Sequence, residues 1–477
     1  MADRSTATDG ESGFLWPLSP FQAVSLFAGF VLVRAYVALA WPAGGGDTAV
    51  YRTVAVNILR NGCVSLSDPA SQACVPHWGG NQLPGFPAFV AAVWALAGES
   101  DAAVLLAQGV VAAATAIWCG ICAGRVARDG RVGTVVAVLL GLSPLGLPWS
   151  RFFLTDALSV AATQCVLAEL LIGLHRGRLR IFGTSVAFAI ALFVRLDNAL
   201  LVVPIAIVGV SLAPSRSGML RLVLIAAVAA LPVVAWWGRS VAVGLPFVPT
   251  VTTLPDGSAA PNGYIRWGNS WMTSQYEYPS WVYPVYGYRY SAIQIPDKAF
   301  ADDAERTKVA ALLAELRTYE GKPIPPEIDD AFSEVVAERY ARHPLRQYVV
   351  LPAIRAGIMW LDPRYSAGWP VSIGEQSTES VWDLLRRSPE VVLIKGLAAL
   401  YRTSLAFAAV VLLYWGGAPW YGRMMLGTAV VYAAVQTIAH VALGLIETRY
   451  LLGATALLEG SLALAVGSAW FSRPVRS

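Results

Sequence analysis

Long apolar runs with almost no charge constrain this 477-residue chain more than any other feature. Several of them approach or exceed the roughly 18–20 residues that an α-helix needs to cross a bilayer. Asp, Glu, Lys and Arg make up only 14% of the chain, against about 25% in an ordinary soluble protein. A soluble fold could not cover so much apolar surface with a charged shell. The sequence therefore predicts an all-α polytopic membrane protein and argues against a soluble enzyme, a disulfide scaffold, a disordered chain or an outer-membrane barrel.

The apolar runs also divide the chain into three parts. Between 243 and 390 it becomes polar and rich in Trp and Tyr, and this stretch is long enough for a small domain. We predict an N-terminal transmembrane module over 1–242, which includes an outer loop at 42–101. An extracytoplasmic loop domain over 243–390 and C-terminal transmembrane helices over 391–477 follow. The runs lie at 21–41, 82–98, 102–124, 132–149, 157–174, 181–194, 198–213, 220–242, 391–416, 424–445 and 450–472.

Arginine-rich loops set the predicted orientation, because Lys and Arg concentrate in short cytoplasmic loops. The clusters lie at 125–131, 176–180, 216–221 and 473–476. All four can face the cytoplasm only if the short run 82–98 is half-inserted from the outer face and does not cross. This arrangement gives a bundle of about ten spanning helices in the plasma (inner) membrane, with both termini inside.

With this orientation, each outward-facing loop carries an acid and a base at the membrane boundary. Charges at that depth are costly unless they pair or line a wet cavity. They can serve as interfacial ion pairs that hold helix ends together. They can also form a site for a lipid-linked phosphate, in which arginines bind the phosphate and an Asp accepts a proton. We favour the second interpretation because packing alone does not require four loops to bring acids to one face. The residues are Asp47 and Arg52, Arg151 and Asp156, Arg195 and Asp197, and Glu447 and Arg449, with His440 two helical turns before Glu447.

The motifs that carry these charges resemble the GT-C integral-membrane glycosyltransferases. The likeness is greatest to the polyprenyl-phosphate-sugar branch, which includes protein mannosyltransferases and aminoarabinosyltransferases. It rests on the order and common sidedness of the motifs. The chain departs from the family at Leu83 and Leu196, where Pro is common, and in having the single acid Asp47 in place of an Asp-Glu pair. The motifs lie at 46–51, 82–89, 143–144, 150–156, 194–197, 236–249 and 447–450.

The resemblance implies a glycosyltransferase that moves a sugar from a polyprenyl-phosphate donor to a glycan, lipid or protein acceptor on the extracytoplasmic face. It implies that Asp47 is the general base or orients the acceptor, and that Asp156 is a second catalytic acid. It requires no cofactor and leaves a divalent metal open, although no His, Cys and Asp cluster has zinc-ligand spacing. The donor phosphate would be held by Arg449, Tyr450, Arg195 and His440, and the acceptor or sugar by Arg52, His77, Trp78, Asp197 and Glu447.

A transporter or flippase of a lipid-linked sugar is the competing hypothesis, with Asp47, Arg195, Glu447 and Glu459 as a charged path. Such proteins commonly contain paired repeats with broken helices at matching positions. The predicted helices instead divide unevenly around the large loop, and the acids gather at one face, so we favour the enzyme. Membrane lipids are expected partners, whereas a net charge of only +4 with scattered arginines gives no reason to expect nucleic acid.

The cysteines and aromatic residues carry further expectations. Cys63 and Cys74 both fall in the first outer loop, where we predict a disulfide. Cys119 and Cys122 form a CxxC pattern inside an apolar helix and are expected to be buried packing residues. The aromatic-rich segment 264–290 is interpreted either as an interfacial belt or as a lid or acceptor groove over the site.

Overall fold

The computed structural model describes residues 17–45, 47–71, 74, 83–244, 258–274, 277–362, 368–369, 381–414 and 417–471. Over these residues the chain is helical, as predicted, and an isolated β-bridge joins Ala43 and Phe152. Seven helical segments are long and apolar enough to cross a membrane. They are α1 (Pro20–Ala40), α4 (Asp101–Ala127), α6 (Asp156–Arg176), α9 (Arg216–Ala242), α16 (Pro389–Tyr414), α17 (Trp420–Ala442) and the continuous pair η8 (Thr448–Leu451) and α18 (Leu452–Phe471).

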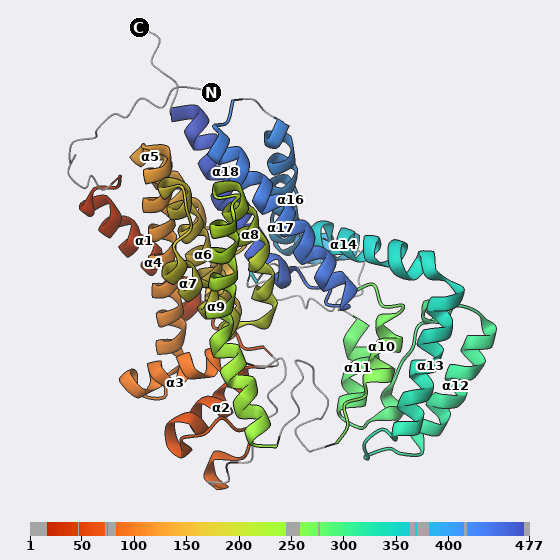
Figure 1. Cartoon of the computed structure of the whole chain (residues 1–477). Coiled ribbons are helices and arrows are strands. Elements are labelled where there is room, and N and C mark those ends of the chain that lie inside the picture. Colours follow the sequence, from red (N-terminus) through yellow and green to blue (C-terminus); the bar gives the residue numbers. More distant parts are fainter. Residues whose placement is uncertain are drawn as a thin grey trace.

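Shorter apolar helices complete the bundle. They are α5 (Gly130–Gly141), α7 (Ile181–Val194) and α8 (Val202–Leu212), which is preceded by the 3-10 turn η3 (Leu196–Leu201). Counted with the seven long segments, they give ten helices for the bundle in the described part of the chain. The remaining short apolar helix, α3 (Gly85–Ala97), lies across the direction of its neighbours in Figure 1, as the predicted half-inserted helix would.

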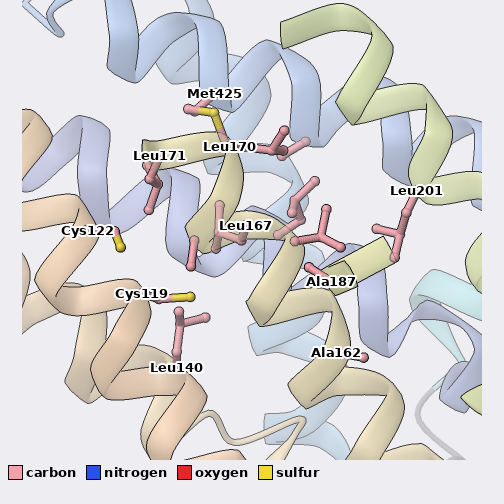
Figure 2. Close-up of a cluster of buried hydrophobic side chains, with 14 of the residues drawn as sticks. Cys119, Cys122, Leu140, Ala162, Leu167, Leu170, Leu171, Ala187, Leu201 and Met425 are labelled. Carbon is pink, nitrogen blue, oxygen red and sulfur yellow. The ribbon is translucent and has the colours of Figure 1, made fainter. Parts of the chain in front are cut away.

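The bundle core is built from small and branched apolar side chains on α4, α5, α6, α17 and α18. Cys119 and Cys122 point into this core near Leu140 and Leu167 (Figure 2), so the CxxC pattern marks packing positions. Helices α4 and α5 approach so closely at Gly120 that a Cβ there would lie 2.6 Å from the carbonyl oxygen of Gly133. Close packing of small residues is the usual basis of helix association in membranes.

The two ends of the bundle carry loops of different charge. At one end, Pro17, just before α1, contacts Gly124 and Gly130 at the arginine-rich α4–α5 loop. The guanidinium of Arg131 in that loop lies 4.8 Å from the ring centre of Phe471, where α18 ends. Both ends of the described chain therefore lie at the arginine-rich face, and the acid-bearing loops lie at the opposite end of the bundle.

A second, smaller helical unit, which we name the outer unit after its predicted side of the membrane, follows α9 and lies beside the acid-bearing end (Figure 1). Its core holds Trp267, Trp271, Trp281 and Tyr290, all fully buried. Most of the aromatic segment is therefore the core of this outer unit and not an interfacial belt, because its rings pack against α12 and α13. The helices of the unit are α10 (Asn262–Asn269), α11 (Tyr278–Tyr286), α12 (Asp303–Arg317) and α13 (Pro326–Arg342), with short turns η5 (Tyr290–Ala292) and η6 (Asp297–Ala299).

The connection back to the bundle is made by η7 (Arg346–Val350) and α14 (Leu351–Leu361), which run from α13 toward α16 and α17 (Figure 1). Trp360 on α14 donates from Nε1 to the hydroxyl of Thr437 on α17 at 3.0 Å. Arg402 on α16 donates from Nε to the carbonyl of Trp360 at 2.8 Å. The outer unit is thus fixed to the bundle through α14. The remaining short elements are α2 (Thr48–Asn61), η1 (Pro69–Ser71), η2 (Leu147–Arg151) and α15 (Val381–Arg387).

Candidate functional site

Arg195 joins two of the acid-bearing loops. Its Nε and Nη2 donate to the two carboxylate oxygens of Asp197 at 3.0 and 2.9 Å, a bidentate pair. Its Nη1 lies 3.2 Å from Oδ1 of Asp156 and also donates to the hydroxyl of Thr155 at 3.1 Å. The side chains of Arg195 and Asp156 are only 16% and 3% exposed, so these charges interact with little screening by water. The second and third acid-bearing loops therefore meet at the guanidinium of Arg195.

Local sequence places these charges at helix ends. Helix α7 stops at Arg195, whose backbone is extended, and the chain turns at once into η3. Asn198 secures this turn by donating to the carbonyl of Ala191 at 2.8 Å and accepting from the hydroxyl of Ser159 at 3.1 Å. Asp156 is the first residue of α6, where the helix dipole favours a carboxylate. Its second oxygen, Oδ2, is buried without a hydrogen-bond partner in the described part of the chain.

The last acid-bearing loop adds an aromatic ring that lies near two arginines. The guanidinium carbons of Arg195 and Arg449 lie 5.4 and 5.3 Å from the ring centre of Tyr450, within cation–π range. The ring of His440 stacks on Tyr450 with centroids 4.9 Å apart. Arg449 also forms an ion pair with Glu447. This loop therefore presents a second guanidinium close to the first.

His440 links this loop to Asp197. Its Nδ1 lies 2.7 Å from the carbonyl oxygen of Gln436, and a carbonyl can only accept, so Nδ1 carries a proton. Its Nε2 lies 3.4 Å from Oδ2 of Asp197.

Asp47 belongs to the same electrostatic neighbourhood. It precedes α2, and its carboxylate does not cap that helix and forms no hydrogen bond or ion pair with another described residue. Its backbone carbonyl accepts from the amide of Tyr51 at 3.0 Å. Tyr51 lies one turn further along α2. Burial raises the pKa of the Tyr51 phenol well above its usual value, and the charges of Asp47 and Asp156 raise it further, while Arg195 and Arg449 lower it. One phenol thus interacts electrostatically with charges from all four acid-bearing loops, and we call this group of side chains the cluster.

The outer unit faces this cluster through α11. Tyr283 is 52% exposed, and burial together with the charge of Glu447 raises the pKa of its phenol, with opposing influence from Arg449 and a further increase from Asp47. The sequence analysis did not single out Tyr51 or Tyr283 as site residues. The spacing of Tyr51 from Asp47, one helical turn, is a signal that could have identified it, whereas nothing in the sequence relates Tyr283 to Asp47.

Among the predicted site residues that the structure describes, Arg52 lies outside the cluster. Arg52 pairs with Asp101 at the start of α4, with Nε 3.3 Å from Oδ1, and its guanidinium lies 5.3 Å from the ring centre of Phe153. It was expected to contact acceptor or sugar, but packing of the first outer loop on α4 gives it a different partner. His77 and Trp78 lie outside the described residues.

Other polar residues of the acid-bearing end hold the loops together. Arg151 donates from Nε to the carbonyl of Trp41 at 2.7 Å and from Nη1 to that of Gly368 at 3.2 Å. Cys63 and Cys74 are joined by a disulfide, with Cα atoms 6.2 Å apart. Among the described residues no group of three or more His, Cys, Asp or Glu side chains could hold a metal ion.

Glu459, a residue of the alternative transport path, lies inside the bundle and away from the cluster. It accepts from the hydroxyls of Ser143 at 2.8 Å and Tyr401 at 2.9 Å. Glu169, the other intramembrane acid, pairs with Arg180. Both acids therefore have the hydrogen-bonded packing that buried carboxylates require.

Comparison with known proteins gives distant structural matches. No protein-family model matches the chain, and no curated protein does. ArnT from Cupriavidus metallidurans, solved in the apo state and bound to undecaprenyl phosphate, is 15% and 16% identical. Each match covers 93% of this chain and 77% or 78% of that one, with TM-scores of 0.36 and 0.37.

The oligosaccharyltransferase of Archaeoglobus fulgidus in its apo form is also similar. It is 12% identical, with a TM-score of 0.44 over 94% of this chain, which spans about half (51%) of its length. Both matched proteins are GT-C glycosyltransferases. Because these TM-scores are below 0.5, the assignment of function rests on the side chains of the cluster.

Proposed function

We propose that this protein is a membrane glycosyltransferase that moves a sugar from a polyprenyl-phosphate donor to an acceptor at the extracytoplasmic face of the plasma membrane. The observation that carries the proposal is that the guanidinium groups of Arg195 and Arg449 both approach the ring of Tyr450, at the end of the bundle that also carries Asp47. Guanidinium groups match phosphate oxygens in geometry and charge. A cluster at one end of an apolar bundle suits a substrate whose hydrocarbon chain stays in the bilayer.

The proposed reaction is a single displacement at the sugar. Phosphate oxygens replace Glu447 on Arg449, and the two guanidiniums stabilise the negative charge that grows as the bond between the sugar carbon and the phosphate oxygen breaks. Asp47 accepts the proton of the acceptor hydroxyl while that oxygen attacks the same carbon. The products are the glycosylated acceptor and polyprenyl phosphate, and the proton then leaves Asp47 for water. His440 and Asp197 hold Arg195 in place.

Purified protein in nanodiscs, supplied with a panel of polyprenyl-phosphate sugars and cell extract as acceptor, tests the proposal. Polyprenyl phosphate release is measured for wild type, Arg449→Gln and Arg52→Gln. The two variants lose the same charge, but only Arg449 belongs to the cluster. We expect turnover with one donor, a fall of about 100-fold in Arg449→Gln and little change in Arg52→Gln. Equal activity of the two variants, or movement of intact donor across the bilayer without release, would contradict the proposal.

A further inference from the structure

A buried arginine outside the cluster connects the outer unit to the loop that carries Glu447, Arg449 and Tyr450. Arg355 lies on α14 and is only 4% exposed. Its Nε and Nη2 donate to the carbonyl of Met272 at 2.9 and 2.7 Å. Its Nη1 donates to the carbonyl of Val441 at 3.1 Å, and Nη2 also bonds the carbonyl of Asn269.

These three carbonyls lie at or just beyond two helix ends. Asn269 is the last residue of α10, Met272 follows it closely, and Val441 lies in the last turn of α17. The final carbonyls of a helix have no partner within that helix and carry the negative end of its dipole. A guanidinium supplies donors in a planar fork and a positive charge, so one side chain caps both helices at once.

Arg355 makes no contact with a carboxylate among the described residues, which distinguishes it from Arg195 and Arg339. Burial lowers its pKa to about 10, still well above neutral pH, so the guanidinium stays charged. A buried guanidinium that is hydrogen-bonded to several backbone carbonyls is costly to lose or to move. The two helix ends are therefore held together by an interaction that tolerates little displacement.

Close packing also holds the ends of α10 and α17 together. Gly444, two residues beyond α17, has a positive φ of 73°, and a Cβ there would lie 2.7 Å from the side chain of Asn269. Val441, Ile446 and Leu451 belong to the hydrophobic core of the outer unit. Both ends of the stretch that carries Glu447, Arg449 and Tyr450 are thus embedded in that unit.

We infer that Arg355 is a positioning residue: by clamping the ends of α10 and α17 together, it fixes the 443–451 loop and thereby holds Arg449 and Tyr450 in register with Arg195. Its effect on a donor phosphate rests on the proposed function, whereas the clamp itself does not. Loss of the clamp lets the loop move relative to Arg195, and small displacements of a binding group are costly.

Two measurements on Arg355→Met, Arg355→Lys and the matched control Arg339→Met test this inference. Arg339 is a second buried arginine of the outer unit, paired with Glu305, and it makes no bond to α17. The first measurement is amide hydrogen exchange of residues 441–451 in nanodiscs, which needs no ligand. We expect exchange about tenfold faster or more in Arg355→Met, a smaller change in Arg355→Lys and none in the control.

The second measurement is the dissociation constant of polyprenyl phosphate. We expect it to rise about tenfold in Arg355→Met and to stay unchanged in Arg339→Met, even if both variants lose thermal stability. Arg355→Lys, which keeps the charge, serves if Arg355→Met does not fold. Unchanged exchange in both Arg355 variants, or equal acceleration in the Arg339 variant, overturns the clamp. Faster exchange in a protein that never binds polyprenyl phosphate supports the clamp and refutes the proposed function instead.

Discussion

Individual residues show how far the sequence predicts the cluster. Asp156, Arg195, Asp197, His440, Glu447 and Arg449 were expected at one face, because the loop charges and the positive-inside rule place them there, and the structure brings them together. Loop charges did not predict the position of Arg52 in the fold. Its partner Asp101 depends on how the first outer loop packs on α4, and a tertiary contact of that kind leaves no local pattern. Tyr283 belongs to the aromatic segment for which a lid was one interpretation, but its individual position was not predicted, because the outer unit brings it in from more than 200 residues away from Asp47.

At the residue scale, matched Asp→Asn variants distinguish buried from exposed ion pairs. Asp197→Asn removes the bidentate partner of Arg195, which is only 16% exposed. We expect a loss of about 3 kcal/mol in the free energy of unfolding, because a nearly buried guanidinium loses its main partner. Asp101→Asn breaks the exposed pair with Arg52 and should cost less than about 1 kcal/mol. Denaturant unfolding in detergent micelles measures both, and equal losses would show that the Arg195 pair is not desolvated.

At the element scale, the length and hydropathy of most helices were predictable from the sequence, and their close contacts were not. The short run that begins Leu83-Pro84-Gly85 was expected to be half-inserted because of the arginine loops, and α3 does lie across the bundle (Figure 1). Nothing in the sequence shows that its first residue, Gly85, touches the backbone of α7. A Cβ at Gly85 would lie 2.2 Å from the carbonyl oxygen of Phe193, two residues before Arg195.

Substitution of Gly85 by Ala tests this contact. The added methyl group must push α3 away from the end of α7, and we expect a loss of about 1–3 kcal/mol in stability together with reduced turnover, because Arg195 follows directly. Gly238→Ala on α9 is the control, since a Cβ there meets no atom within 4 Å. That variant should be neutral or slightly more stable, as expected when Ala replaces Gly in a helix. Thermal unfolding and polyprenyl phosphate release report the two effects, and a Gly85→Ala protein that matches Gly238→Ala would refute the role given to this contact.

At the scale of the whole molecule, the arginine-rich loop and the acid-bearing loops occupy opposite ends of the bundle, and the outer unit lies at the acid-bearing end. The sequence predicted this division because arginine content indicates which end of the bundle a loop occupies, even when the contacts of that loop are unknown. The sequence did not show whether the aromatic segment is a folded core or an interfacial belt, because both are rich in Trp and Tyr. Only the packing of Trp267, Trp271 and Trp281 against α12 and α13 separates the two.

The orientation of the molecule is tested by single cysteines at exposed positions of the two ends. Thr318→Cys lies in the outer unit and Arg178→Cys in the α6–α7 loop, and both sites are exposed. With a membrane-impermeant maleimide on intact spheroplasts, we expect labelling of Thr318→Cys at once and of Arg178→Cys only after permeabilisation. The reverse pattern would mean that the cluster faces the cytoplasm, and it would contradict the predicted orientation.

The most direct test of the proposed glycosyltransferase activity is polyprenyl phosphate release by wild type and Asp47→Asn, with binding of polyprenyl phosphate measured on the same samples. We expect turnover by wild type with one donor and a fall of about 100-fold or more in Asp47→Asn. Binding should stay unchanged, because the arginines and Tyr450 remain. Wild-type turnover in Asp47→Asn would contradict the assignment of Asp47 as the base.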